Sequence, residues 1–329
     1  MKQNDPKNSA ADIRKRQRAA GKSIGKFFAP AAFVLCALAV TAVVLLFPEF
    51  TAEFGRAAVG NAPGKAGEGS AAVYFIDVGQ GDCALIHSGE TDILIDSGEY
   101  DRYPDVCRVL NLLGVTELDY VIVSHPHSDH MGCMSRILER YGAGEVIMPD
   151  IPEQLLPAYG SYVYMMSVIE EKDIPVVYAG PGKSADLGDA GVLDFIAPAA
   201  VYDDLNNMSA AVRYRFGSRS FLFCGDIENE AEHDIIASGA DISADVIKVP
   251  HHGSGSSSTR AFVQAVSPEY AVFSCGEQND FGHPHPNILQ LYSSLGAQIY
   301  RTDINGTVAF VTDGERLDIS CEKERRAAA

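Results

Sequence analysis

Basic residues are scarce in this sequence of 329 residues. Lysine and arginine number 26 against 44 aspartate and glutamate residues, and eight of those 26 lie within the first 26 positions. The rest of the chain therefore holds 42 acidic and 18 basic residues. This acidic balance argues against non-specific adhesion to nucleic acids and other polyanions, so a polymer of that kind would need a local basic cluster to bind.

Closely paired cysteines and tandem repeats are also lacking. Cys36 lies in an apolar run, and the other six cysteines are scattered without close paired spacing: Cys83, Cys107, Cys133, Cys224, Cys275 and Cys321. A domain of this size does not need disulfides for stability, so we expect buried free thiols. The absence of a short tandem repeat excludes an array of small repeated units.

One long segment without charge is present, FFAPAAFVLCALAVTAVVLLF, at residues 27–47. At about 1.5 Å per residue a helix of this length spans a hydrocarbon core of about 30 Å, so we expect one transmembrane helix. A cleaved signal peptide would have a shorter apolar region, and a buried helix would rarely be apolar all round. The basic residues before the segment predict a single-pass protein of the cell membrane with a cytoplasmic N-terminus and an extracellular domain.

The expected organisation follows from this segment and from composition. Residues 48–70 are rich in glycine and alanine, which is typical of a flexible linker. We expect a basic cytoplasmic tail at 1–26, the membrane helix at 27–47, the linker at 48–70, a folded domain at 71–321 and a disordered tail at 322–329.

Short strand patterns alternate with helical patterns from Ala71 onward. AAVYFIDV, CALIHS and DILIDS are separated by turns that contain glycine, and RSFLFCG follows AAVRYRF through a hairpin at GSR. A long helix is expected from about Pro152 to Asp173. Because hairpins open each half of the domain, we expect an α/β fold of two mixed β-sheets flanked by helices.

Histidine and aspartate cluster in SHPHSDHMGC, residues 124–133, directly after the apolar run LDYVIV. His125, His127, Asp129 and His130 lie where a strand ends and a helix begins, so their side chains can converge. Imidazole nitrogen and carboxylate oxygen are the ligands that borderline divalent metals prefer. The sequence therefore predicts a metal site here.

Further candidate ligands follow later strands. Asp226 ends FLFCGD, His251 and His252 follow DVIKVP, and GHPH supplies His283 and His285. His87 lies within a strand pattern and His233 within a polar helix, and we interpret both as ordinary residues.

These motifs resemble a known family. HPHSDH matches the H-x-H-x-D-H signature of the metallo-β-lactamase fold, and FLFCGD resembles the strand of that fold that ends in a metal-bridging aspartate. In order along the chain, FIDVGQGD, ILIDSG, NNMS, IKVPHHGS, FGHPHP and YRTDINGTV resemble the ComEC-type competence proteins. The resemblance covers about residues 72–320 and implies an αββα sandwich.

The resemblance implies a role for each ligand. His125 and His127 would hold one metal, Asp129 and His130 the second, and Asp226 would bridge the two. The last ligand of the second metal would be His251, His252 or His283. Asp96 matches an aspartate of the fold that orients a ligand histidine.

One position departs from the family pattern, because no histidine occurs from residue 131 to residue 225. The candidate there is NNMS, with Asn206 and Asn207, and the alternative interpretation is that both are turn residues before a strand. Oxygen ligation would shift the metal preference from zinc toward manganese or magnesium. We therefore expect two divalent metal ions, zinc or manganese.

The expected chemistry is hydrolysis. A water shared by two cations is acidified to hydroxide and attacks the electrophile. We assign catalytic roles to Asp129 within the cluster and to His285 or His252, whichever is not a ligand, as the proton donor to the leaving oxygen. The turn HHGSGSSST, at a helix start, and the hairpin arginines Arg213, Arg215 and Arg219 are candidate phosphate contacts.

The sequence is compatible with three candidate functions. The first is an extracytoplasmic metal-dependent phosphodiesterase, most simply a DNA nuclease of the ComEC kind. The second is a hydrolase that uses the same site on a phosphorylcholine ester, a lactone or a β-lactam. The third is a binding module anchored in the membrane, against which the intact H-x-H-x-D-H motif argues. ComEC-type proteins carry this domain behind a channel of many helices, so a role in DNA uptake would require a separate channel protein as partner.

Overall fold

The structure is a computed structural model, and it describes Gly67 and residues 69–323. The expected tail at 1–26 and the expected membrane helix at 27–47 lie outside the described residues, as does nearly all of the linker. Among the residues that are described, no helix is both long and apolar enough to cross a membrane.

The first sheet has eight strands in the order β15-β14-β1-β2-β3-β4-β5-β6. Pairing is antiparallel from β15 to β3 and parallel from β3 to β6, so the sheet is mixed. Its strands are β1 (Ala71–Phe75), β2 (Ala84–Ser88), β3 (Thr91–Ile95), β4 (Tyr120–Ile122), β5 (Glu145–Pro149), β6 (Val176–Ala179), β14 (Val308–Thr312) and β15 (Leu317–Cys321).

The second sheet has seven strands in the order β13-β12-β11-β10-β9-β8-β7. It is parallel from β13 to β10 and antiparallel from β10 to β7, and the expected hairpin at GSR joins β9 to β10. Its strands are β7 (Ser184–Asp186), β8 (Val192–Phe195), β9 (Val212–Phe216), β10 (Arg219–Phe223), β11 (Val246–Lys248), β12 (Tyr270–Phe273) and β13 (Gln298–Arg301).

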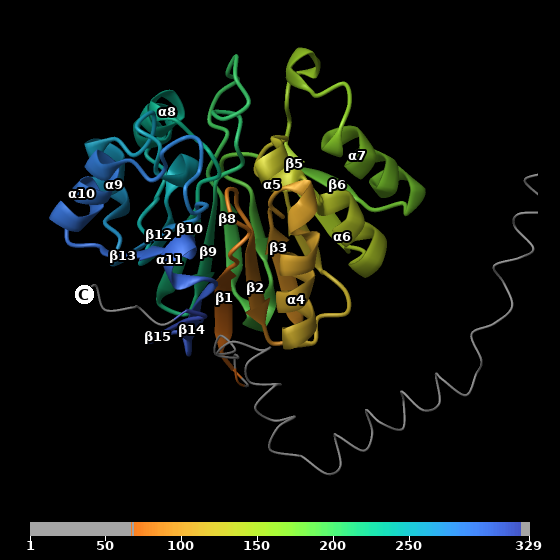
Figure 1. The fold of residues 1–329 in the computed structure, drawn as a ribbon, viewed down its shortest axis with the longest axis horizontal. Coiled ribbons are helices and arrows are strands. Elements are labelled where there is room, and N and C mark those ends of the chain that lie inside the picture. Colours follow the sequence, from red (N-terminus) through yellow and green to blue (C-terminus); the bar gives the residue numbers. More distant parts are fainter. Residues whose placement is uncertain (1–66, 68, 324–329) are drawn as a thin grey trace, which may run out of the picture. The chain divides into compact units, whose positions relative to one another are not determined.

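Helices cover the outer face of each sheet, which gives four layers (Figure 1). Beside the first sheet lie α4 (Tyr103–Leu113), α5 (Ser128–Met131), α6 (Met134–Tyr141) and α7 (Ser161–Glu171). Beside the second lie α8 (Asn229–Ser238), α9 (Arg260–Val266) and α10 (Pro286–Ser294), with the short α11 (Thr302–Asn305) after β13. The expectation of two mixed sheets flanked by helices is confirmed.

The strand period explains how one element serves two cores. In β1, Ala72 and Tyr74 pack against the helices, whereas Val73 and Phe75 face the other sheet. Successive side chains of a strand point to opposite faces, so a strand covered on both faces is apolar throughout. Phe75 stacks on Phe223 of β10 with ring centroids 5.7 Å apart, which joins the sheets at the centre of the domain.

The expected long helix from Pro152 to Asp173 is wrong. The structure has a 3-10 turn at Glu153–Leu155, then an irregular stretch, and α7 begins only at Ser161. Pro157 and Gly160 lie in that stretch, and Gly160 has a φ of 81°. Proline lacks the amide hydrogen that a helix interior requires, so the helical pattern is interrupted.

The described cysteines are not joined in disulfides, as expected. Cys83, Cys107, Cys133, Cys224 and Cys275 are buried, Cys321 is partly exposed, and none of these six forms a disulfide. Cys36 lies outside the described residues.

Candidate metal centre

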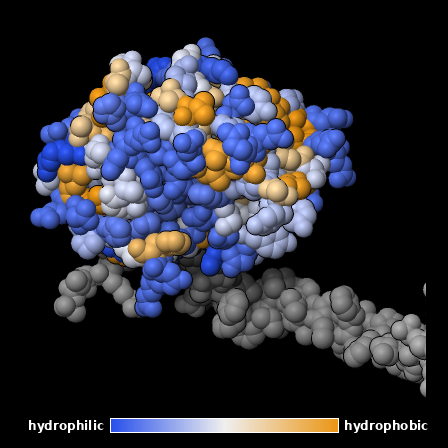
Figure 2. All heavy atoms as spheres, turned by 90° about the horizontal axis from the view of Figure 1, so that it is seen from above, coloured by the Kyte–Doolittle hydropathy of each residue, from blue (hydrophilic) through white to orange (hydrophobic). Residues whose placement is uncertain are grey.

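The candidate ligands meet where strands of both sheets end. His125 follows β4, Asp226 follows β10, and His251 with His252 follows β11. The helices α5 and α8, which come next along the chain, lie at the same upper end of the sheets in Figure 1. Seen from above, this end is mainly hydrophilic, with hydrophobic side chains in small separate groups (Figure 2).

Two glycines allow the segments to approach this closely. A Cβ on Gly225, whose φ is 54°, would lie 2.8 Å from the Cβ of Ser124, so glycine lets Asp226 reach the histidine cluster. A Cβ on Gly81 would lie 2.2 Å from the backbone oxygen of Asp129. The amide of Asp82 also donates to that oxygen at 3.0 Å, so the GQGD loop supports the backbone of Asp129.

Four side chains converge in one group: Asp129, His130, Asp226 and His252. The Nε2 atom of His130 lies 3.2 Å from Asp226 Oδ1, and Nε2 of His252 lies 3.2 Å from Asp129 Oδ2 and 3.5 Å from Asp226 Oδ2. One atom from each of the four residues lies within 4.8 Å of the others. Two imidazoles and two carboxylates at this separation form a donor set that suits a divalent cation.

His125 and His127 form a second group beside the first. His125 Nε2 and His127 Nδ1 are 2.9 Å apart, close enough to bind one ion together. The His125 ring lies 4.2 Å from the His130 ring, centroid to centroid, so the two groups adjoin. Both carboxylate oxygens of Asp226 point toward the four-residue group, Oδ1 toward His130 and Oδ2 toward His252.

Three buried nitrogen and oxygen atoms of the site lack a hydrogen-bond partner in the part of the chain that is described. Among the described residues, His130 Nε2, His252 Nε2 and Asp226 Oδ1 are buried and have no hydrogen-bond partner. Leaving such atoms unsatisfied costs about 1–3 kcal/mol each, which favours a bound cation or a proton shared between the imidazole and the carboxylate. Imidazole and carboxylate lone pairs are the donors that a divalent metal cation prefers, so the residues present fit such an ion.

Buried partners fix which histidine nitrogen faces the group. Asp96 Oδ2 lies 2.9 Å from His130 Nδ1, and the carbonyl of Ser274 lies 3.0 Å from His252 Nδ1. Carboxylates and carbonyls accept hydrogen bonds, so each Nδ1 carries the hydrogen and each Nε2 keeps its lone pair for a metal. The hydrogen bond expected between Asp96 and a ligand histidine is present.

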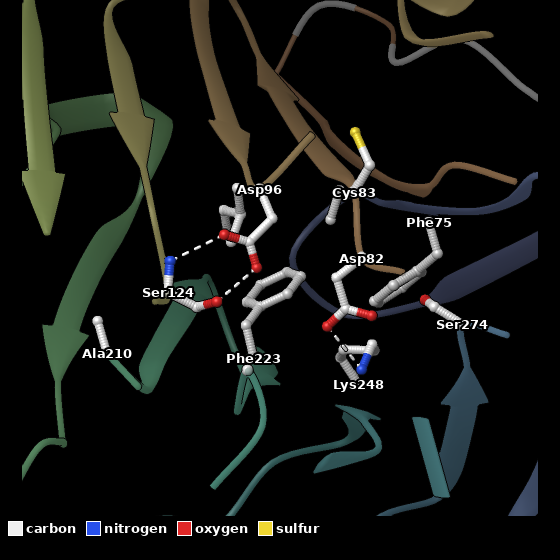
Figure 3. A pocket seen from close by; sticks show the side chains of 12 residues that line it. Phe75, Asp82, Cys83, Asp96, Ser124, Ala210, Phe223, Lys248 and Ser274 are labelled. Carbon is white, nitrogen blue, oxygen red and sulfur yellow. Dashed lines mark hydrogen bonds and ion pairs between the residues drawn. The ribbon is translucent and has the colours of Figure 1, made fainter. Parts of the chain in front are cut away.

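A small buried cavity lies under this shell, between the two sheets (Figure 3). Lys248 enters it and donates to Asp82 at 2.7 Å, while the other oxygen of Asp82 lies 3.2 Å from His252 Nδ1. On the opposite side, Ser124 donates to Asp96 through its backbone amide and its hydroxyl, at 2.8 Å and 2.7 Å. Hydrogen bonds and the buried ammonium group of Lys248 therefore hold the carboxylates behind the ligands in place.

The paired histidines sit in a strained turn. His251 has φ 48° and His252 has φ 55°, and two successive left-handed residues other than glycine are rare. Each costs on the order of 1–3 kcal/mol and is found mainly at functional sites. The turn sends the His252 ring into the group and leaves His251 beside it, with Nε2 3.7 Å from Asp226 Oδ2. The sequence leaves His251, His252 and His283 open as the last ligand, and of the three the turn brings His252 closest to Asp129 and Asp226.

The pKa values of four buried or half-buried histidines are shifted in opposite directions. Burial, together with the neighbouring His130, holds the pKa of His125 well below its usual value and lowers that of His127. Burial opposes charge on His130 and His252 as well, but Asp226 and other carboxylates raise the pKa of both well above the usual value. Without a cation, these shifts favour the protonated form of His130 and His252 and the neutral form of His125 and His127.

His283 and His285 lie at the rim. The His283 ring is 5.5 Å from the His251 ring, 6.2 Å from the His252 ring and 5.1 Å from the His285 ring. Burial, followed by the neighbouring histidines, lowers the pKa of His283 to about 4. His285 Nδ1 accepts from the Gly255 amide at 2.8 Å, which leaves its hydrogen on Nε2.

The two asparagines of the NNMS segment make different contacts. Asn207 Oδ1 accepts from the amides of Glu228 and Ala231, so its side chain is part of the start of α8. Asn206 donates to Glu228 at 3.3 Å, and its Oδ1 is buried with no hydrogen-bond partner among the described residues. Of the two asparagines, only Asn206 thus offers a free oxygen.

The expected phosphate contacts are not free to act as such. Arg213, Arg215 and Arg219 are engaged by Asp241, Asp194 and Asp245. In the serine-rich turn, the amides of Ser258 and Thr259 donate to the buried carboxylate of Glu232. A carboxylate of the chain thus already fills the position where a phosphate was expected.

Sequence reasoning missed two partners of the site. Glu228 Oε1 lies 3.1 Å from His251 Nδ1, and it also accepts from Ser256 at 2.9 Å. Lys248 neutralises Asp82, as described above. The signal for Glu228 was its position two residues after Asp226, and the signal for Lys248 was a charge within an otherwise apolar strand.

Comparison with known proteins agrees with this geometry. A sequence profile of the metallo-beta-lactamase superfamily matches residues 76–277. The chain is 26% identical over 256 residues to ComE operon protein 3 of Bacillus subtilis (strain 168), which covers 72% of this chain and 32% of the relative. It is 29% identical over 249 residues to competence protein ComA of Neisseria gonorrhoeae, with 74% and 32% covered. The chain thus spans about a third of the length of these relatives, and the resemblance to ComEC-type proteins is confirmed.

The fold is found in a solved structure as well. A mutant of CmlA beta-hydroxylase superposes with a TM-score of 0.50 at 16% sequence identity. The superposition covers 75% of this chain and 54% of that chain. At this identity the likeness concerns the fold alone.

Proposed function

This chain belongs to the metallo-beta-lactamase superfamily, and from that premise we propose that it is a metal-dependent phosphodiesterase, most simply a DNA nuclease of the ComEC type. The observation that carries the proposal is the ligand group that converges on Asp226, with the pair His125 and His127 directly beside it. Paired cations are suited to phosphoryl transfer because they act on both the attacking and the leaving oxygen. The similarity to competence proteins supports DNA as the phosphodiester.

We assign the ligands as follows. His125 and His127 hold one cation, and Asn206, whose Oδ1 has no hydrogen-bond partner among the described residues, is a candidate for a further oxygen ligand. Asp129, His130 and His252 hold the other, and Asp226 is shared. Zinc or manganese suits this mixture of nitrogen and oxygen donors. When bound, such cations polarise the phosphoryl oxygens and lower the pKa of a water.

Other residues orient the ligand histidines or act on the leaving oxygen. Asp96 and the Ser274 carbonyl hold the Nδ1 hydrogens of His130 and His252 in place. His285 is the proposed hydrogen-bond donor to the leaving oxygen, because the Gly255 amide occupies Nδ1 and directs the hydrogen to Nε2. A donor is required only when the leaving oxygen is basic. His285→Ala should therefore slow DNA cleavage far more than cleavage of an activated aryl phosphodiester.

The test uses the full chain, stripped of metal and reloaded separately with zinc, manganese or magnesium. Substrates are single-stranded DNA, a small aryl phosphodiester, a phosphorylcholine ester, a lactone and a β-lactam. We expect cleavage of both phosphodiesters, with manganese at least as effective as zinc. A metal-loaded chain that opens the lactone or β-lactam and leaves both phosphodiesters intact would contradict the proposal.

Two variants control this experiment. Asp226→Ala removes the shared carboxylate and should abolish turnover together with metal binding. Asp318→Ala removes an exposed aspartate on the edge strand β15, far from the site in sequence and sheet, and should leave both unchanged. Full metal content with normal rates in Asp226→Ala would remove Asp226 from the site.

We also propose that residues 27–47 anchor the domain outside the membrane. This proposal rests on their uncharged sequence and on the basic tail before them. A protease added to intact protoplasts should remove the domain and leave the tail protected. Survival of the domain would contradict this topology. Within this proposal, DNA transport would depend on a separate channel protein.

A further inference from the structure

An exposed aromatic ring stands beside the metal centre. Phe281 is 64% exposed and stacks on His283, with centroids 5.6 Å apart and an interplanar angle of 20°. His283 stacks in turn on His252 at 29°. A continuous aromatic stack therefore runs from the ligand group to solvent and ends in a ring with its outer side uncovered.

The segment that carries Phe281 is held in place. Asn279 Oδ1 accepts from the amides of Phe281 and His283 at 3.2 Å and 3.0 Å. Its Nδ2 donates to the carbonyl of Gly276 at 2.9 Å. The ring is thus positioned before any ligand arrives, which reduces the conformational entropy that binding would cost.

A polar groove begins on the other side of His285. It has a volume of about 590 Å³, and Gly255, whose amide binds His285, is part of its wall. Asn229, Asn287, Gln290 and Arg260 also line it, and none of its described lining residues is acidic. In a chain with a formal charge of −18 this groove is locally basic.

Arg260 is free to bind an anion. Among residues 69–323, its side chain has no ion pair, hydrogen bond or aromatic partner, whereas the hairpin arginines are each paired with a carboxylate. A free guanidinium in a groove without carboxylates is suited to a phosphate group.

We propose that Phe281 and Arg260 extend the metal centre into a binding path for single-stranded nucleic acid. A base next to the scissile phosphate stacks on Phe281, and a phosphate farther along the strand contacts Arg260. Aromatic platforms combined with a basic groove are the means by which proteins hold single strands with little sequence preference. This inference rests on the proposed phosphodiesterase function and adds the residues that would select a polymer over a small diester.

Stacking is tested with Phe281→Ala and an abasic substrate. On an oligonucleotide with all its bases, the variant should lose about 5- to 150-fold in kcat/KM, which corresponds to stacking on one base. On an oligonucleotide that lacks the base at the stacked position the loss should disappear, and Phe281→Trp should restore the rate on the complete substrate. Tyr178→Ala is the matched control, because Tyr178 is 49% exposed and lies on β6 at the edge of the first sheet, whereas Phe281 follows β12 of the second sheet.

The phosphate contact is tested with Arg260→Ala. Oligonucleotide affinity should fall, and the slope of log affinity against log salt should become shallower by about 0.7, the value for one phosphate contact on a single strand. Arg316→Ala, at an exposed arginine of the β14–β15 turn, should change neither quantity. Equal effects of the two arginine variants would overturn the role of Arg260.

A small phosphodiester without an aromatic group separates this inference from the proposed function, because it has no ring to stack on Phe281 and is too short to reach Arg260. Normal turnover of the small diester by both variants, with the losses on DNA described above, supports the binding path. Equal losses of Phe281→Ala on complete and abasic strands, or no loss on either, overturn it. If the wild type cleaves neither diester, the proposed function fails, and oligonucleotide binding by the metal-loaded chain, measured by fluorescence anisotropy, still decides the path.

Discussion

Lys248 donates a hydrogen bond to Asp82 at 2.7 Å, and both side chains are buried behind His252. The pair places a positive charge under a centre that otherwise holds only carboxylates and histidines. Burial lowers the pKa of Lys248, but Asp82 and Asp226 raise it by more, so the net pKa is raised and the ammonium stays charged. The site therefore depends on an ion pair that makes no contact with the proposed substrate.

Removing one partner of this pair should destabilise the fold. We expect Lys248→Met to lower the free energy of unfolding by about 3–5 kcal/mol, because it removes the nearest counterion of the buried Asp82 carboxylate and leaves only the His252 contact. Chemical denaturation of the metal-free chain measures this loss. Asp82→Asn combined with Lys248→Met should recover part of it, whereas Lys172→Met, at an exposed lysine, should have little effect. A loss in Lys248→Met no larger than that in Lys172→Met would contradict this account.

The hydrogen bond from His130 to Asp96 should control metal affinity. Asp96→Asn keeps the shape of the side chain but removes the charge that favours the hydrogen on Nδ1. We expect metal affinity to fall about 10- to 100-fold, as measured by competition with a chelator. Asp92→Asn is the control, because Asp92 makes a similar 2.7 Å contact with His87 away from the centre. Equal affinities in the two variants would show that Asp96 does not orient a ligand.

Metal binding should release protons. In the metal-free chain the carboxylates around His130 and His252 hold the pKa of each well above its usual value despite burial. A ligand histidine must be neutral, so an arriving cation displaces these protons and its affinity should rise with pH. Calorimetry at pH 7 in buffers with different ionisation enthalpies should report about two protons released. Release of no protons would mean that these histidines are already neutral.

The same shifts set the pH dependence of the metal-free fold. The pKa of His130 and of His252 is raised in the folded state. Their contribution to the free energy of unfolding is therefore fully present below about pH 6.5 and is lost as pH rises through the raised values. The pKa of Asp226 is depressed by the two histidines in spite of burial, so its contribution is lost as pH falls through that low value. Thermal unfolding should therefore show that metal stabilises the chain more at pH 9 than at pH 6.

Local sequence patterns were enough to predict the ligand types and the architecture. The H-x-H-x-D-H motif, Asp226 and the paired histidines each follow an apolar strand, and strand ends of both sheets meet at one edge. What could not be predicted depends on tertiary contacts or on backbone conformation. Lys248 and Asp82 are 166 positions apart in sequence, and their pairing arises only when β11 packs beside the GQGD loop. The direction of each ring in the pair His251 and His252 depends on two left-handed residues that no periodic pattern reveals.

These two neighbouring histidines should therefore differ in function. His252 is buried, its Nδ1 is held by the Ser274 carbonyl, and its Nε2 lies between Asp129 and Asp226. His251 is partly exposed, and its Nδ1 faces Glu228. We expect the first to be required for metal and the second to act on the substrate side of the centre.

Asparagine is the informative substitution at both positions, because it tolerates the left-handed backbone better than alanine does. His252→Asn should lose tightly bound metal, measured by elemental analysis after dialysis, and with it the rise in Tm that metal produces. His251→Asn should keep the metal held by Asp129, His130, His252 and Asp226 while turnover falls. Glu228→Gln should resemble His251→Asn more weakly, because it removes the charge opposite His251 Nδ1 and leaves the ring in place. Loss of metal in His251→Asn with full retention in His252→Asn would reverse the two assignments, and the ring that the turn directs inward would then not be the ligand.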